Sequence, residues 1–255
     1  MVRHAVLALS FAACATAADH GDARNDVGKP PDAMIDSNGC PVQPCTILPQ
    51  CGCIGTSACD LDPVVGAGTA CRSISTQGHE TAACDTLDDC DKGYICAGNA
   101  QYSSCKKYCM ADADCGTPRG RCAIDITSNG TPVAGIPTVC SSNCDPVSTN
   151  PPECPSTFKC NVITTMHGGQ SVTIASCALA GIGGQGADCK VGTGGDDTRC
   201  NKSFACTTID GGSTFKCRKY CTNPGSAGQC GGSNVCIGFG NTLTLAGVTY
   251  GVCPP

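Results

Sequence analysis

The stretch from Cys84 to Cys122 reads CDTLDDCDKGYICAGNAQYSSCKKYCMADADCGTPRGRC and decides how the chain folds. It returns to cysteine every few residues and holds too few large apolar side chains to bury a core of its own. The same layout recurs from Cys189 to Cys236. Because so little apolar surface is available, links between cysteines must replace a hydrophobic interior. We interpret both stretches as pairs of small cross-linked units joined by a three-residue hinge.

The composition of the whole chain agrees with this interpretation. Its 255 residues include 27 cysteines and no tryptophan, and aromatic residues make up 4%. This is typical of a disulfide scaffold, which requires an oxidising compartment. A formal net charge of −5 without a basic tract gives no electrostatic basis for binding nucleic acid. No segment after the N-terminus is long and apolar enough to span a bilayer.

Residues 1–17 predict an export signal, because Arg3 and His4 precede an apolar run that ends in small residues. Two cleavage sites remain open. Residues 15–17 (ATA) suit an ordinary signal peptidase, whereas residues 11–14 (FAAC) are similar to a bacterial lipobox, in which Cys14 would be lipidated. Either route takes one of the 27 cysteines away and leaves 26 for pairing. Residues 18–39, rich in Asp, Gly and Pro, predict a flexible tether.

The remainder is an internal duplication, with copy A at residues 40–140 and copy B at 141–255. Twelve cysteines of one copy match twelve of the other, and each copy divides into three quartets. Cys40 and Cys51 are left over and are expected to bridge each other. The quartets of copy A are Cys45, Cys53, Cys59 and Cys71; Cys84, Cys90, Cys96 and Cys105; and Cys109, Cys115, Cys122 and Cys140. Those of copy B are Cys144, Cys154, Cys160 and Cys177; Cys189, Cys200, Cys206 and Cys217; and Cys221, Cys230, Cys236 and Cys253.

The last interval of several quartets predicts a β-hairpin. Apolar-alternating arms flank residues 128–130 (SNG), residues 166–169 (MHGG) and Ala246-Gly247, which are turn sequences. No stretch shows a sustained helical period with caps. The expected fold class is a small disulfide-rich protein of tandem irregular β-hairpin units with little helix, in two copies of a three-unit array.

The segment CDTLDDCDKGYIC, residues 84–96, resembles the C-x-x-D-x-D-C-x-x-G-x-x-C pattern of Dickkopf N-terminal cysteine-rich repeats, and residues 109–115 (CMADADC) repeat its first half. The order of signal, Asp/Pro-rich tether and tandem quartets is similar to that of cysteine-rich surface lipoproteins of myxobacteria. The resemblance implies an exported scaffold and no catalytic residue. Four cysteines allow three pairings, and the sequence alone does not choose among them. By analogy with other small modules, we expect first-to-third and second-to-fourth bridges.

The candidate binding residues are two basic segments at matching places, Lys106-Lys107-Tyr108 and Arg218-Lys219-Tyr220. A cation pair beside an aromatic ring can grip an anionic glycan or a protein. The alternative is a solvated turn whose tyrosine covers the adjoining bridges. A third interpretation makes the basic pairs the bait loops of a protease inhibitor.

Metal and catalytic sites are not expected. Zinc favours C-x2-C pairs, which the chain lacks. Aspartates 85, 88, 89 and 91 could bind calcium, but their spacing is not that of an EF-hand loop and copy B lacks the cluster, so a role in turns is preferred. His79 and His167 stand at unmatched positions, and no catalytic motif surrounds them. We therefore expect no catalytic residue, metal or cofactor.

These observations predict an exported, non-enzymatic surface protein, lipid-anchored through Cys14, that presents a rigid scaffold to an unknown protein or glycan. It would lie at the outer membrane or cell surface, or be periplasmic or extracellular if the anchor is absent. The alternatives are a disulfide-rich protease inhibitor, a calcium-binding adhesion module and a hydrolytic enzyme with a dispersed site.

Overall fold

The structure is a computed structural model that describes residues 40, 44–62, 68–75, 77–99, 102–128, 131–133, 135–208 and 211–255. The predicted signal (1–17), the lipobox-like residues 11–14 with Cys14, and the tether (18–39) lie outside the described residues. No helix in the described part of the chain is long and apolar enough to cross a membrane.

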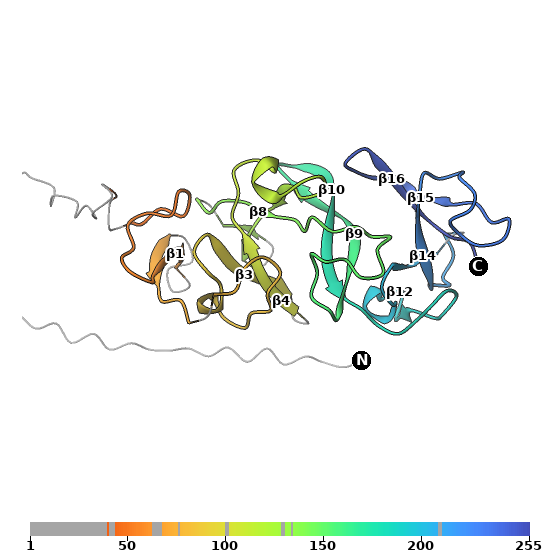
Figure 1. The fold of residues 1–255 in the computed structure, drawn as a ribbon, viewed down its shortest axis with the longest axis horizontal. Coiled ribbons are helices and arrows are strands. Elements are labelled where there is room, and N and C mark those ends of the chain that lie inside the picture. Colours follow the sequence, from red (N-terminus) through yellow and green to blue (C-terminus); the bar gives the residue numbers. More distant parts are fainter. Residues whose placement is uncertain are drawn as a thin grey trace, which may run out of the picture. The chain divides into compact units, whose positions relative to one another are not determined.

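Short antiparallel strands and three single-turn 3-10 helices make up the regular structure of the described residues (Figure 1). The fold class predicted from the sequence is therefore confirmed. In copy A the elements are β1 (Ala58–Leu61), β2 (Thr69–Arg72), η1 (Leu87–Asp89), β3 (Tyr94–Asn99), β4 (Tyr102–Lys107), η2 (Asp112–Cys115), β5 (Cys122–Ile124), β6 (Thr127–Ser128), β7 (Thr131–Pro132) and β8 (Val139–Cys140). In copy B they are β9 (Phe158–His167), β10 (Gln170–Leu179), β11 (Lys190–Val191), β12 (Gly194–Gly195), η3 (Asp197–Arg199), β13 (Phe204–Thr207), β14 (Lys216–Thr222), β15 (Ile237–Leu245) and β16 (Val248–Val252).

Every quartet is bridged first to third and second to fourth, which is the pairing expected above. The two leftover cysteines, Cys40 and Cys51, are bridged as well. We name the units A1 (Cys45–Cys71), A2 (Cys84–Cys105), A3 (Cys109–Cys140), B1 (Cys144–Cys177), B2 (Cys189–Cys217) and B3 (Cys221–Cys253). Their bridges are 45–59 and 53–71, 84–96 and 90–105, 109–122 and 115–140, 144–160 and 154–177, 189–206 and 200–217, and 221–236 and 230–253.

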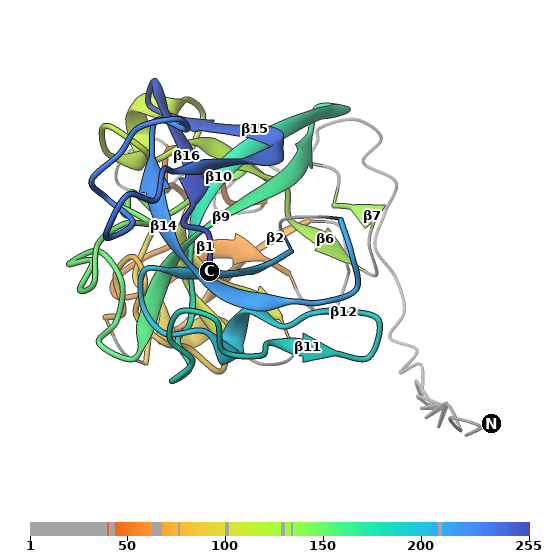
Figure 2. The same cartoon turned by 90° about the vertical axis from the view of Figure 1, so that its right-hand side faces the viewer.

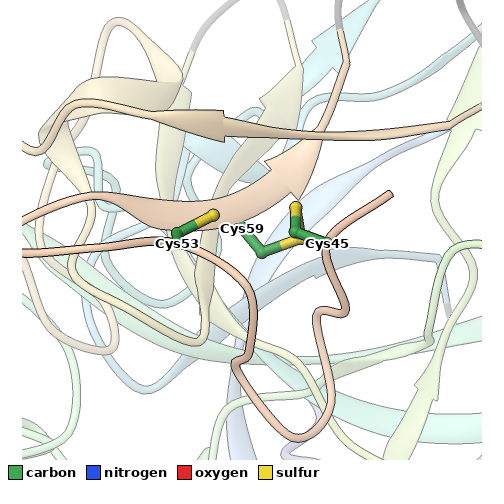
Figure 3. A group of neighbouring side chains, drawn as sticks. All are labelled: Cys45, Cys53 and Cys59. Atoms are coloured by element: carbon green, nitrogen blue, oxygen red, sulfur yellow. A yellow bond between two sulfur atoms is a disulfide. The ribbon is translucent and has the colours of Figure 1, made fainter. Parts of the chain in front are cut away.

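The two bridges of a unit lie together because of how its hairpin is paired. In five units the third and fourth cysteines face each other across the hairpin, as Cys59 faces Cys71. Residues directly opposite in an antiparallel pair project from the same face of the sheet. Sulfur atoms of both bridges therefore gather on one face, as Cys45, Cys53 and Cys59 do within 4.8 Å of one another (Figure 3). This clustering follows from two adjacent disulfides.

Cysteines form much of the buried interior. The buried clusters of A2, A3, B2 and B3 each consist of three cysteines with a few partly buried neighbours. Two larger clusters hold aromatic and aliphatic side chains. One of them lies in copy A around Tyr108 and Val139, and the other lies in copy B around Phe158 and Tyr250.

The prediction of a three-residue hinge between the second and third units is wrong. Strand β14 runs without interruption through residues 217–221 and pairs with β13 on one side and β16 on the other (Figure 2). In copy A the chain continues from β4 through Tyr108, which pairs with Val139 of β8. In copy B, residues 216–219 pair with β13 and residues 220–222 pair with β16, so backbone pairing continues through the segment. Units two and three therefore share one extended strand.

The predicted hairpins are present. Strands β9 and β10 pair over ten positions and turn at Gly168-Gly169, and β15 and β16 turn at Ala246-Gly247. All four turn residues have positive φ, as a two-residue hairpin turn of this hand requires. Between Cys122 and Cys140, β6 pairs with β7, while Asn129 and Gly130 lie outside the described residues.

Candidate functional site

The tyrosines of the two basic segments are buried and reach back to the first unit of their own copy. Tyr108 is 1% exposed, and its hydroxyl donates to Oδ1 of Asp60 at 2.5 Å. Tyr220 is 2% exposed, and its hydroxyl donates to Oδ1 of Asn161 at 2.5 Å. Asp60 and Asn161 each follow the third cysteine of their unit. Burial raises the pKa of both tyrosines, to which a nearby aspartate adds, so both hydroxyls are donors at neutral pH.

The second cation of each segment reaches forward to the third unit. Lys107 donates from Nζ to the carbonyl oxygen of Asp114 at 2.8 Å, and Lys219 donates to that of Gln229 at 3.4 Å. Asp114 and Gln229 each precede the second cysteine of their unit. The same pair of contacts therefore ties the first, second and third units together in each copy.

The first cation of each segment is largely enclosed. Burial lowers the pKa of Lys106, against the attraction of Glu80, and Nζ of Lys106 lies 3.4 Å from Oγ of Ser142. Arg218 is 8% exposed, and its Nε and Nη1 have no hydrogen-bond partner among the described residues. The Arg218 side chain is therefore not presented to solvent as a grip for a ligand, whereas a role for the half-buried Lys106 in binding stays a prediction.

These placements bear on the predicted binding residues. Tyr108, Tyr220 and Arg218 are interior side chains, and the pairs lie within β4 and β14 rather than in a protruding bait loop. Lys107 and Lys219 retain surface exposure, and a role for them in binding a ligand stays a prediction.

A largely buried cation joins the first unit of each copy to the second, a link that the cysteine spacing does not predict. In copy A, Nε of Arg72 lies 2.6 Å from Oδ2 of the fully buried Asp60, and Nη2 donates to the carbonyl oxygen of Tyr94 at 3.0 Å. In copy B, Nζ of the fully buried Lys159 donates to the carbonyl oxygen of Phe204 at 2.7 Å.

Tyr94 and Phe204 occupy equivalent positions, two residues before the third cysteine. The cation that reaches them has changed strand between the copies. Arg72 pairs across the hairpin with Ala58 in copy A, whereas Lys159 pairs with Ala178 in copy B.

The acidic partner has moved as well. Asp60 is replaced by Asn161, and the carboxylate of Asp197 in η3 lies 2.6 Å from Nζ of Lys159. Burial lowers the pKa of Lys159 and Asp197 opposes the shift. Comparing the residues beside the third and fourth cysteines of the two copies would have revealed from sequence that Asp60 and Arg72 are replaced, but not that Asp197 is the new acidic partner.

The two copies are in contact, and the described residues belong to one compact unit. Nη2 of Arg119 in copy A lies 2.8 Å from Oδ2 of Asp145 in copy B, and its Nε donates to the hydroxyl of Tyr250 at 3.0 Å. The rings of Tyr102 and Phe158 approach to 4.0 Å between centroids. The bond from Arg119 holds Tyr250 of β16 against copy A.

Asp89, one of the aspartates considered for calcium, and Asp114 at the matching place of A3 serve the turns before the second cysteines of their units. Oδ2 of Asp89 accepts from the backbone N–H groups of Asp85 and Thr86, at 2.8 and 2.9 Å. Asp114 accepts in the same way from Met110 and Ala111, at 2.9 and 3.0 Å. These backbone donors lower the pKa of both carboxyls, with Thr86 the largest cause for Asp89 and Met110 for Asp114. This is the role in turns that was preferred from the sequence.

No family model, no curated protein and no solved structure matches the chain. The thirteen disulfides by themselves fit an extracellular disulfide-rich protein.

Proposed function

We propose that this chain is an exported, non-enzymatic surface protein whose two copies form a stiff scaffold for contact with other molecules. One observation supports it most. In each copy the tyrosine between units two and three is buried and hydrogen-bonded to unit one, so three small cross-linked units act as one body. A scaffold built this way holds its surface in place without a large apolar core.

The N-terminal residues supply the second half of the proposal. The apolar run and the FAAC sequence at residues 11–14 support lipidation of Cys14, with residues 18–39 as the tether. The similarity to cysteine-rich surface lipoproteins of myxobacteria supports the same location. Under this proposal the chain touches the membrane through the N-terminal lipid alone.

Intact mass of the purified mature protein, before and after reduction and alkylation, tests both halves. We expect a chain that begins at Cys14 with acyl groups attached, and a gain of 26 alkyl groups that appears only after reduction. The control is Cys14→Ser, which should lose the acyl mass and keep every bridge. A mature chain that begins after residue 17 would refute the anchor. Free thiols before reduction would refute the scaffold.

The protease-inhibitor alternative gains no support, because its basic pairs lie within strands.

A further inference from the structure

A cavity of about 480 Å³ lies in unit B3, between the β15–β16 hairpin and the turn that follows β14. Its size falls within the range of small-ligand sites. Asn223, Gly238, Phe239, Thr242 and Thr249 contribute to its wall. The strands that carry it are the dark-blue ribbons of Figure 2.

An irregularity of strand pairing opens this cavity. Gly238 pairs with Gly251 and Leu243 pairs with Tyr250, so residues 239–242 bulge out of the ladder. The matching hairpin of copy A, β5 with β8, has an irregularity of one residue directly after Cys122, closer to the bridge than in copy B. Bulges re-aim side chains and are common next to functional sites. Here the bulge places Phe239 and Thr242 at the cavity.

The wall of the cavity is held in position by its neighbours. The backbone N–H of Asn223 donates to the carbonyl oxygen of Thr249 at 2.8 Å. The half-buried ring of Phe239 lies 6.2 Å from the ring of the buried Tyr220, between centroids. Tyr250, which also lines the cavity, is 1% exposed and is fixed by Arg119. A ligand would therefore meet a surface that is already formed.

The chemistry of the wall selects the ligand. The side chains of Asn223 and Thr242 are exposed and make no hydrogen bond within the described part of the chain, and the hydroxyl of Thr249 has Thr244 as its neighbour at 3.1 Å. An amide and hydroxyls offer both donors and acceptors, and Phe239 adds an apolar face. None of the described residues that line the cavity is charged.

We propose that this cavity binds a neutral saccharide. A sugar ring combines hydroxyls that donate and accept with a face of C–H groups that can pack on an aromatic ring. An anionic ligand would find no cation in the wall to offset its loss of hydration. This inference rests on the proposed function in one respect, since it names the class of molecule that the scaffold contacts.

The test is a titration of the full mature chain, labelled with nitrogen-15, with neutral hexasaccharides of glucose and of N-acetylglucosamine. Separate arms use a nucleoside and an unlabelled neutral peptide. We expect saturable amide shifts for at least one saccharide, confined to residues 222–224, 237–243 and 248–250. Phe239→Leu keeps an apolar side chain at this place but removes the flat ring, and Asn223→Ala removes the amide. Each should weaken binding about five- to tenfold, whereas Asn241→Ala, in the same bulge but outside the wall, should leave affinity unchanged.

Three results would overturn the proposal. They are the absence of saturable shifts with every saccharide, saccharide binding that Phe239→Leu leaves unchanged, and equal or tighter binding of the nucleoside or the peptide at the same residues. The proton–nitrogen spectra of the variants also report whether each remains folded. None of these outcomes depends on where the protein is anchored, so failure here is distinct from failure of the mass measurement on Cys14.

Discussion

Replacing Arg72 with methionine tests how much the ion pair between Arg72 and the buried Asp60 contributes to the free energy of unfolding. The Arg72 side chain is 10% exposed and Asp60 is fully buried, so Arg72→Met leaves a buried charge with two remaining donors, the hydroxyl of Tyr108 and the backbone N–H of Leu61. Breaking a buried ion pair on one side costs about 3–5 kcal/mol. We expect the loss in unfolding free energy to lie toward the lower end, because those two hydrogen bonds persist.

Copy B supplies the compensating change. There Asn161 stands in place of Asp60 and accepts the tyrosine hydroxyl, and Ala178 stands in place of Arg72. The double variant Asp60→Asn with Arg72→Met should therefore recover most of the loss. The coupling between the two changes is expected to be at least about 2 kcal/mol.

The assay is guanidinium unfolding with all bridges intact, followed by far-ultraviolet circular dichroism and by tyrosine fluorescence, whose transitions should coincide. The matched control is Arg121→Met, which removes an exposed ion pair with Asp112 at 3.3 Å and should cost less than about 1 kcal/mol. A double variant that loses as much as the two single variants added together would refute the reasoning.

Three further predictions follow from the buried contacts. Because the pKa of Tyr108 is raised in the folded state, the unfolded chain loses its proton first above about pH 10, so stability should fall as pH rises there, and Tyr108→Phe should flatten that fall in unfolding measured from pH 8 to 11. Gly183→Ala should destabilise by about 1–3 kcal/mol, because its Cβ would lie 2.8 Å from a backbone oxygen and 3.0 Å from Sγ of Cys217, whereas Gly184→Ala meets nothing within 4 Å and should be nearly neutral in the same assay. Reduction should abolish the far-ultraviolet signal of the hairpins without any denaturant, and a chain that keeps this signal in strong reductant would contradict the role given to the bridges.

Cysteine spacing predicted a large part of this fold, because the two bridges of a unit leave its hairpin few alternative conformations. The turn at Ala246-Gly247 and the six quartets could be read directly from the sequence. The continuous strand through Cys217 and Cys221 could not, since its partner β16 lies more than twenty-five residues downstream and pairing at that distance leaves no local signal. A short polar segment between cysteines looks like a hinge in the sequence unless the strand that pairs with it is known.

The basic segments show a second limit of sequence reading. Charge and an aromatic ring in Lys106-Lys107-Tyr108 suggested a surface grip, yet Tyr108 is buried against a carboxylate from another unit. Burial of a polar side chain depends on a partner, here Asp60, which stands 48 residues away. The segment recurs in copy B, and a polar residue follows the third cysteine of the first unit in both copies. Comparing these two positions together would have predicted the buried contact of the tyrosine.

Several contacts within a copy recur in both copies, whereas the contacts between the copies do not. Tyr108 and Tyr220 each bind back to unit one, and Gly78 and Gly183 each pack on the bridge that closes unit two. By contrast, the loop of copy B that matches Arg119, residues 231–235 (GGSNV), holds no charged residue, and a threonine stands where copy A has Tyr102.

A contact that is needed for each copy to fold must be kept in both after a duplication. A contact that joins the two copies uses different residues in each copy, so neither copy has to keep the residues that the other contributes. We therefore infer that a single copy is the folding unit and that the junction is specialised. Cutting the chain directly after Cys140 should leave copy B, residues 141–255, folded with its bridges intact, and its β9–β10 amides should exchange with solvent as slowly as in the whole chain. Loss of protection throughout β9 and β10 would show instead that the two copies fold as one.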